Sequence, residues 1–218
     1  MLVRKYPQSH LLIKSVDTKI IIDPGNITFN MVLPDGSTGF KVEEFQNMDA
    51  YLITHSHADH VDPLHIKEIV GEAKVYGNND VVAKLKESGV SVIETKDRES
   101  FRVGSLEITP VDLPHCKMVD GSDGPPNTGF LIDGVLFHPG DGDQAPASVF
   151  SKNVALPIAG PSITEDGALK FAKDLQAEII IPIHYDSRFS VDIEAFKQKA
   201  FEVGLKVIPL FPGDETEI

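Results

Sequence analysis

Short apolar runs separated by turn residues recur along the whole chain. Residues 2–6, 11–16 and 19–22 are predicted to form a meander of short strands, which Asp23-Pro24-Gly25 closes with a turn. Residues 26–48 have few periodic apolar positions and are predicted to form a loop or a short excursion.

Strands and helices alternate through the rest of the chain. Runs rich in apolar and β-branched residues predict strands at 50–54, 74–76, 90–93, 101–103, 105–114, 128–132, 135–137, 154–158, 178–183 and 205–210. Helical spacing predicts helices at 64–70, 79–88, 163–175 and 191–203. Asp62 with Pro63, and Ser162 with Glu165, are expected to begin two of these helices. The alternation predicts an α/β protein in layers.

The run at 50–54 ends abruptly in four polar residues that can bind metal. Its length and β-rich composition favour a buried strand, and His55, His57, Asp59 and His60 follow directly. In a loop that leaves a strand, His55 and His57 can converge on one cation, while Asp59 and His60 turn towards a second position. Imidazole nitrogen and carboxylate oxygen both suit zinc-like ions.

The same arrangement of a strand followed by a candidate ligand occurs three more times. His115 follows the strand that runs to Pro114, Asp141 follows the strand at 135–137, and His184 ends the strand at 178–183. We therefore expect all of these side chains to meet at one edge of the fold.

Other reactive residues have simpler explanations. His10 is expected to be a structural or rim histidine, and His65 a surface residue or a neighbour of the site. Cys116 could be a ligand or a nucleophile, but a packing role is favoured because no separate Cys/His/Asp constellation surrounds it. His138 is expected to hydrogen-bond near the site in a second shell. A chance cluster of histidines in a solvated loop explains one histidine more easily than four together.

The string H-x-H-x-D-H after an apolar strand, with further ligands in order, resembles the signature of the metallo-β-lactamase superfamily. The resemblance covers nearly the whole chain and implies a single domain at 1–218. Its implied fold is a four-layer αββα sandwich with the metal site at one edge of the β-sandwich. It also implies that His55, His57 and His115 bind one metal, that Asp59, His60 and His184 bind a second, and that Asp141 bridges the two.

Within the superfamily the chain looks most like small metal-dependent hydrolases related to the L-ascorbate-6-phosphate lactonase group. The residues that carry this likeness are Ile22-Asp23-Pro24-Gly25, Ile53 to His60, Gly140-Asp141, the segment 157–162 and Ile181-Pro182-Ile183-His184-Tyr185. It implies a binuclear enzyme that uses a metal-bridging hydroxide on a small anionic lactone, ester or amide. Zinc is the preferred ion, with manganese and iron as alternatives.

Roles for individual residues follow from this mechanism. Asp59 could orient the attacking water or take its proton, and Tyr185, Asp186 and Arg188 are candidate substrate contacts because they follow His184 directly. Two alternatives stay open: a phosphodiesterase acting on a small nucleotide, and a metal-binding or regulatory protein without turnover.

Charge and composition restrict the partners. The formal net charge is −13, from 33 acidic and 20 basic residues, which argues against binding to a nucleic acid polymer. The single cysteine excludes an intrachain disulfide framework. No signal-peptide pattern or membrane-length apolar run is found, so a cytoplasmic protein with a small-molecule substrate is expected. A homo-oligomer is compatible with the sequence, which contains no readable interface.

Overall fold

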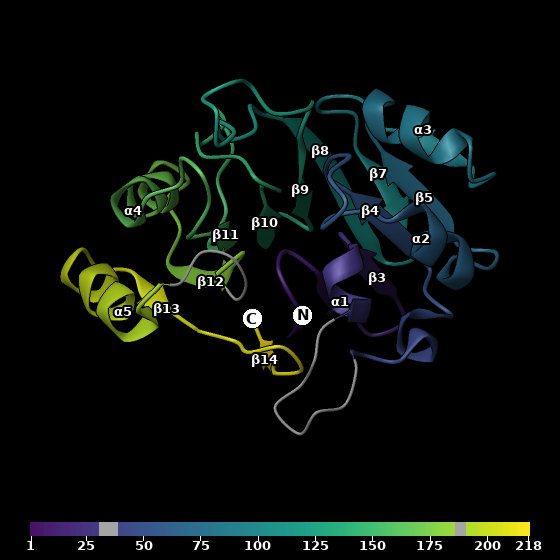
Figure 1. Ribbon diagram of the computed structural model, residues 1–218. Coiled ribbons are helices and arrows are strands. Elements are labelled where there is room, and N and C mark those ends of the chain that lie inside the picture. The colour runs from purple at the N-terminus through teal and green to yellow at the C-terminus, as the bar shows by residue number, and fades with distance from the viewer. Residues whose placement is uncertain (31–38, 186–190) are drawn as a thin grey trace.

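Two β-sheets lie face to face, with helices on both outer sides, in a computed structural model that describes residues 1–30, 39–185 and 191–218 (Figure 1). The first sheet has the strand order β14-β1-β2-β3-β4-β5-β6. Its strands are β1 (Leu2–Lys5), β2 (Leu11–Lys14), β3 (Lys19–Ile22), β4 (Ala50–Ile53), β5 (Lys74–Gly77), β6 (Val92–Glu94) and β14 (Glu215–Glu217).

The second sheet has the order β13-β12-β11-β10-β9-β8-β7 and repeats the plan of the first. Its strands are β7 (Phe101–Val103), β8 (Leu106–Asp112), β9 (Thr128–Ile132), β10 (Leu136–His138), β11 (Asn153–Pro157), β12 (Ile179–Ile183) and β13 (Lys206–Val207). Each sheet begins as an antiparallel meander and continues with parallel strands. Parallel strands need long crossover connections, and several of these contain the helices of the outer layers.

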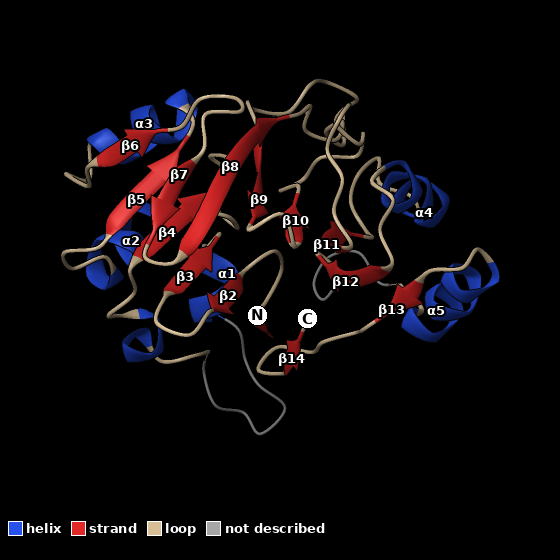
Figure 2. Ribbon diagram, turned by 180° about the vertical axis from the view of Figure 1, so that it is seen from behind, coloured by secondary structure: helices blue, strands red, loops and turns tan. Residues whose placement is uncertain are grey.

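Helices cover the outer face of each sheet, as Figures 1 and 2 show from opposite sides. The first sheet carries α2 (Pro63–Ile69) and α3 (Asn79–Lys86), and the second carries α4 (Glu165–Asp174) and α5 (Ile193–Glu202). A short helix, α1 (Asn26–Asn30), and a 3-10 turn, η1 (Val42–Phe45), lie between β3 and β4. The predicted four-layer αββα sandwich is therefore confirmed.

The alternation along the central strands explains how the layers are held together. Ile20 and Ile22 of β3 belong to the core between the sheets, whereas Ile21 belongs to the core beneath α2 and α3. In β4, Leu52 faces the first of these cores and Tyr51 the second. A strand buried on both faces needs a continuous apolar run, which is the pattern that the sequence shows.

Three sequence predictions differ from the structure. Residues 26–30 form α1 and residues 42–45 form η1, within a segment predicted mainly as a loop. Thr164 caps α4 by accepting a hydrogen bond from the Gly167 amide, whereas the Ser162 hydroxyl accepts one from the Lys117 amide. The predicted closing strand is reduced to β13, and the chain then crosses to β14, which pairs with β1. The sequence Glu-Thr-Glu of β14 lacks an apolar signal because this strand forms the sheet edge.

The strand ends that carry the candidate ligands all lie at one edge of the sandwich. They are the ends of β4, β8, β10 and β12, and an isolated bridge between His115 and Gly142 joins two of the following loops. None of the helices in the described ranges is long and apolar enough to cross a membrane.

Candidate metal centre

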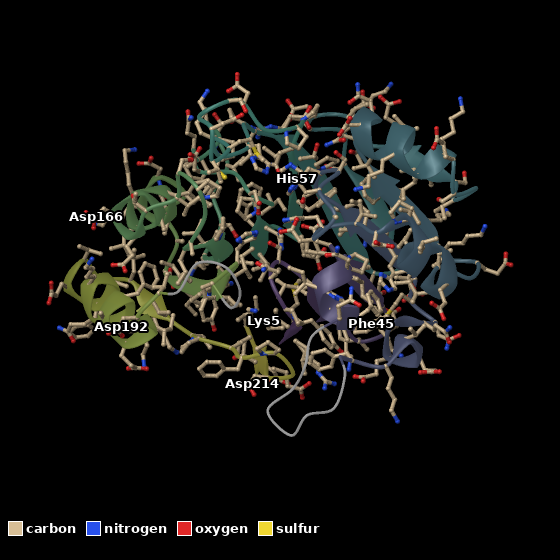
Figure 3. The ribbon with its side chains drawn as sticks, in the orientation of Figure 1. Lys5, Phe45, His57, Asp166, Asp192 and Asp214 are labelled. Carbon is tan, nitrogen blue, oxygen red and sulfur yellow. The ribbon has the colours of Figure 1, made fainter. Side chains whose placement is uncertain are left out.

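The segment from His55 to His60 turns tightly as it leaves β4. The amides of His60 and Val61 both donate to the His57 carbonyl, at 3.1 and 2.9 Å, so the segment forms a compact coil. Asp62 then caps α2 by accepting hydrogen bonds from the Leu64 and His65 amides, which confirms the predicted helix start. Figure 3 labels His57 in the upper part of the view, between the helices on its left and those on its right.

The first group of candidate ligands consists of His55, His57, His115 and Asp141, and the atoms they offer lie within 4.8 Å of one another. His55 Nε2 is 3.1 Å from His57 Nδ1 and 3.9 Å from Asp141 Oδ2. His115 Nε2 is 3.6 Å from the same carboxylate oxygen. Residues that follow three different strands thus converge on one point.

The second group consists of Asp59, His60 and His184. His184 Nε2 lies 3.4 Å from Asp59 Oδ2, and His60 Nε2 lies 4.0 Å from that oxygen. Asp141 also reaches this group, because its Oδ1 is 3.3 Å from His60 Nε2 and its Oδ2 is 3.5 Å from His184 Nε2. One carboxylate therefore lies between the two groups.

Hydrogen bonds fix the ring nitrogens that face the cluster. The Thr54 hydroxyl donates to Asp23, so it can only accept from His55 Nδ1, which lies 3.0 Å away. His60 Nδ1 donates to Asp23 Oδ2 at 2.7 Å, and His115 Nδ1 donates to the Cys116 carbonyl at 2.6 Å. In a neutral imidazole the other nitrogen, Nε2, then carries a lone pair. These three lone pairs face the cluster.

The cluster fits a pair of metal ions by two observations. Four donors about 2.1 Å from one ion in a tetrahedron are separated by about 3.4 Å, which is close to the spacings seen here. The Nε2 atoms of His60, His115 and His184, together with Asp141 Oδ1, are buried and have no hydrogen-bond partner among the described residues. A lone pair that faces a carboxylate oxygen in the interior is unfavourable, and a metal ion or a proton between the two atoms relieves it.

The pKa values of the buried histidines and carboxylates also indicate that this site favours positive charge. Although burial opposes protonation, the carboxylates of Asp141 and Asp23 raise the pKa of His60 well above its usual value. Burial likewise opposes ionisation of Asp141, but His184 and His60 lower its pKa well below the usual range. Burial lowers the pKa of His55, with His60 adding to the effect, so this ring is neutral and able to act as a ligand. A metal ion would replace the protons that the carboxylates attract.

Asp23 holds two residues of the site in place, although the sequence analysis assigned it only to a turn and to the segments that carry the family likeness. Its buried carboxylate accepts hydrogen bonds from the Thr54 amide at 2.8 Å and from the Thr54 hydroxyl and His60 Nδ1 at 2.7 Å each. Its φ of 52° is in the left-handed region, and the turn it opens brings Gly25 against Asp59. A Cβ atom at Gly25 would lie 1.8 Å from the Asp59 carbonyl oxygen, so only glycine fits. The string Asp-Pro-Gly signals a turn, but not its contact with residues 54–60.

Asn127 and His138 hold the loop that carries Asp141. The Asn127 side chain donates to the Pro139 carbonyl at 2.9 Å and accepts from the Asp141 amide at 3.3 Å. His138 Nδ1 accepts from the Gly140 amide, and its Nε2 donates to the Ser9 carbonyl. His138 thus acts on the loop next to Asp141 and contacts no ligand side chain in the part of the chain described. Asn127 had no sequence signal beyond its place in a loop.

A cavity of about 430 Å³ opens onto both groups. Its lining includes His57, Asp59, His115, Asp141 and His184. Tyr185, predicted to contact substrate, does not line it: this side chain is buried, and its hydroxyl donates to the Leu210 carbonyl. Asp186 and Arg188 lie outside the described residues, and their predicted contacts stay untested.

His10 and His65 belong to neither group of candidate ligands, and Cys116 adjoins the cluster through its backbone alone. His10 is buried with Nδ1 2.9 Å from the Thr28 hydroxyl, and His65 stacks on Phe29. Cys116 is buried, and this burial raises the pKa of its thiol to about 12, as a packing residue requires.

Comparison with known proteins gives one consistent relationship. Residues 3–184 match the model of the beta-lactamase superfamily domain. The UPF0173 metal-dependent hydrolase of Pyrococcus abyssi is 30% identical over 217 residues, which cover 92% of each chain. The corresponding protein of Thermoplasma volcanium is 31% identical over 175 residues, covering 74% of this chain and 78% of the relative. Among solved structures, Igni18, a metallo hydrolase from Ignicoccus hospitalis, superimposes with a TM-score of 0.79 at 25% identity over 100% of this chain and 98% of its own.

Proposed function

This chain belongs to the beta-lactamase superfamily and, within it, to the UPF0173 metal-dependent hydrolases, and from that membership we propose a binuclear enzyme that hydrolyses a small lactone, ester or amide. The observation that carries the proposal is the position of Asp141. Its two carboxylate oxygens lie 3.3 to 3.9 Å from the Nε2 atoms of His55, His60, His115 and His184, which come from both ligand groups. A carboxylate in this position suits a bridge between two cations.

Zinc is the ion we propose, because a set of imidazole and carboxylate ligands with nearly tetrahedral spacing favours it. Manganese and iron accept the same ligand types and are the alternatives to be compared. When bound, such a pair of ions lowers the pKa of a water molecule and polarises the oxygen of the bond to be broken.

The chain's own residues supply position and charge for that chemistry. Asp59 lines the cavity with a side chain that is 29% exposed, so its carboxylate can accept a hydrogen bond from an attacking water and orient it. Burial opposes ionisation of Asp59, but the nearby imidazoles of His184 and His60 hold the pKa of Asp59 below its usual range, so the carboxylate stays ionised. Burial of His55, His60 and Asp141 removes bulk water from the other side of the site.

A metal analysis combined with a small panel of substrates tests the proposal. We expect two metal ions per chain in the wild type after loading with zinc, and loss of metal in Asp141→Ala. The loaded wild type should hydrolyse δ-valerolactone or p-nitrophenyl acetate faster than bis(p-nitrophenyl) phosphate, and Asp141→Ala should reduce this activity by at least a hundredfold. Asp143→Ala, two residues further along the chain, is a matched control that should keep both metals.

Two outcomes would support the alternatives. Faster turnover of the phosphodiester would favour a nucleotide phosphodiesterase. Two bound metals without turnover of any of these compounds would favour a metal-binding or regulatory protein. The likeness to the L-ascorbate-6-phosphate lactonase group, the cytoplasmic location and self-association stay predictions from the sequence.

A further inference from the structure

Beyond the candidate metal ligands, the lining of the cavity is mainly apolar, and its two polar members are Gln8 and Asn26. The apolar part of the wall is formed by Ile27 of α1, Ala58 of the loop after β4, Met118 and Val119 after His115, and Pro161 after β11. These residues come from four separate segments of the chain, so the fold gathers them at the mouth of the site.

Val119 is 84% exposed, and a tight turn holds it in that position. The Met118 amide donates to the Ser122 carbonyl at 2.9 Å, and the Gly121 amide donates back to Met118 at the same distance. Asp120 closes the turn by accepting hydrogen bonds from the amide and hydroxyl of Ser122. Burial of the exposed Val119 surface against a bound molecule would be favourable.

No lysine or arginine lines the cavity in the described ranges of the chain. Two cations on adjacent segments already have partners: Lys117 forms an ion pair with Asp123, and Lys84 donates to the Ser56 carbonyl. The net charge of −13 also repels anions at long range. Among the described residues, the wall therefore offers a substrate no cationic side chain, and its polar groups are the side-chain amides of Gln8 and Asn26.

From these observations we infer that the site takes a substrate whose remote part is an uncharged alkyl or acyl chain. The chain extends from the scissile group over Met118 and Val119 towards Pro161. The inference rests on the proposed hydrolase function and replaces the expectation of an anionic substrate with a narrower class, neutral esters, lactones or amides with an apolar tail.

A matched set of esters tests the inference on the zinc-loaded protein. For p-nitrophenyl acetate, butyrate and hexanoate, we expect kcat/KM to rise by about fourfold for each added methylene, the factor that burial of one methylene provides. The p-nitrophenyl hemisuccinate carries a carboxylate where the butyrate has its methyl group. We expect the butyrate to be preferred over the hemisuccinate by at least tenfold.

Val119→Lys places a cation on the wall and should reduce this preference by at least fivefold. Because Val119 is exposed, the variant should fold normally. Val16→Lys is the matched control, since Val16 is fully exposed and does not line the cavity. Its selectivity should equal that of the wild type.

A second readout does not depend on turnover. Hexanamide should shift the methyl NMR signals of Ile27, Met118 and Val119 in both the metal-free and the zinc-loaded protein, and should leave Val16 unchanged. Turnover of all esters without a preference for chain length, or faster turnover of the hemisuccinate, would overturn the inference while the hydrolase function stands. No turnover of any ester, with methyl shifts present, would overturn the hydrolase function and leave an apolar binding site. Absence of the shifts would overturn the binding site itself.

Discussion

Replacement of Asp23 by asparagine should weaken the binding of one metal without unfolding the protein. Asp23 Oδ2 accepts from both the Thr54 hydroxyl and His60 Nδ1, at 2.7 Å each. An asparagine of the same shape can keep its oxygen towards the Thr54 amide, but its NH₂ group then faces the other two donors. His60 can relieve this conflict by moving its proton to Nε2, which is the atom that faces Asp59 and Asp141. The ring would then no longer be a ligand.

The expected size of the effect follows from the hydrogen bonds that change. Loss of an outer-shell partner of a metal-binding histidine costs about 10-fold to 100-fold in metal affinity. Asp23→Ala is more severe for stability, because it leaves three buried donors unpaired at about 1–3 kcal/mol each. We therefore expect the alanine variant to lose at least about 3 kcal/mol of the free energy of unfolding.

Zinc titration calorimetry and elemental analysis would measure the first effect, and urea denaturation with a chelator present would measure the second. Asp49→Asn is the matched control, because its carboxylate also accepts a backbone hydrogen bond, from Lys19, but is exposed. The control should bind two metals with wild-type affinity. If Asp23→Asn also bound two zinc ions with unchanged affinity, the argument that Asp23 fixes the tautomer of His60 would be refuted.

Three further predictions address packing and titration. Gly25→Ala should lower the metal content, and it should lower the free energy of unfolding by about 1–3 kcal/mol, because its Cβ would collide with the Asp59 carbonyl. Gly89→Ala has open space around its Cβ and should keep the metals. Equal metal loss in the two variants would contradict this prediction. The Cys116 thiol, with a pKa raised by burial to about 12, should react with a disulfide reagent at pH 8 only after unfolding; modification of the native protein within seconds would be evidence against it. Burial lowers the pKa of His10 in the folded protein well below the value of about 6.5 that it has in the unfolded chain. As the pH drops below about 6.5, the unfolded chain therefore binds a proton that the folded protein does not. The free energy of unfolding should then fall by up to about 1.4 kcal/mol for each pH unit. Urea denaturation of His10→Gln should show a flatter dependence between pH 6.5 and 5, and an unchanged slope would show that His10 does not titrate on unfolding.

Most of the strands and helices could be predicted from local sequence patterns. The strand at β4, the cap of α2 by Asp62 and the hairpin around Gly104 depend on residues close together in the chain, so their patterns are readable. The continuous apolar runs of β3 and β4 agree with their burial on both faces. The four-layer sandwich itself was implied by the resemblance to the metallo-β-lactamase superfamily. The predicted start of α4 at Ser162 was wrong because a serine hydroxyl can bind more than one partner. The Ser162 hydroxyl accepts a hydrogen bond from the distant Lys117 amide, and Thr164 caps the helix instead.

The identity of the candidate ligands was likewise set by the sequence, because each follows a strand and has a side chain suited to metal. Their arrangement was decided by tertiary contacts. Asp23 precedes His60 by 37 positions, yet its carboxylate sets which nitrogen of that ring faces the cluster. The apolar part of the cavity wall depends in the same way on tertiary structure, because Ile27, Val119 and Pro161 are far apart in the chain and line one cavity in the fold. A sequence pattern records which groups are available, but hydrogen-bond direction and cavity lining depend on three-dimensional distance, which only the packed sheets fix.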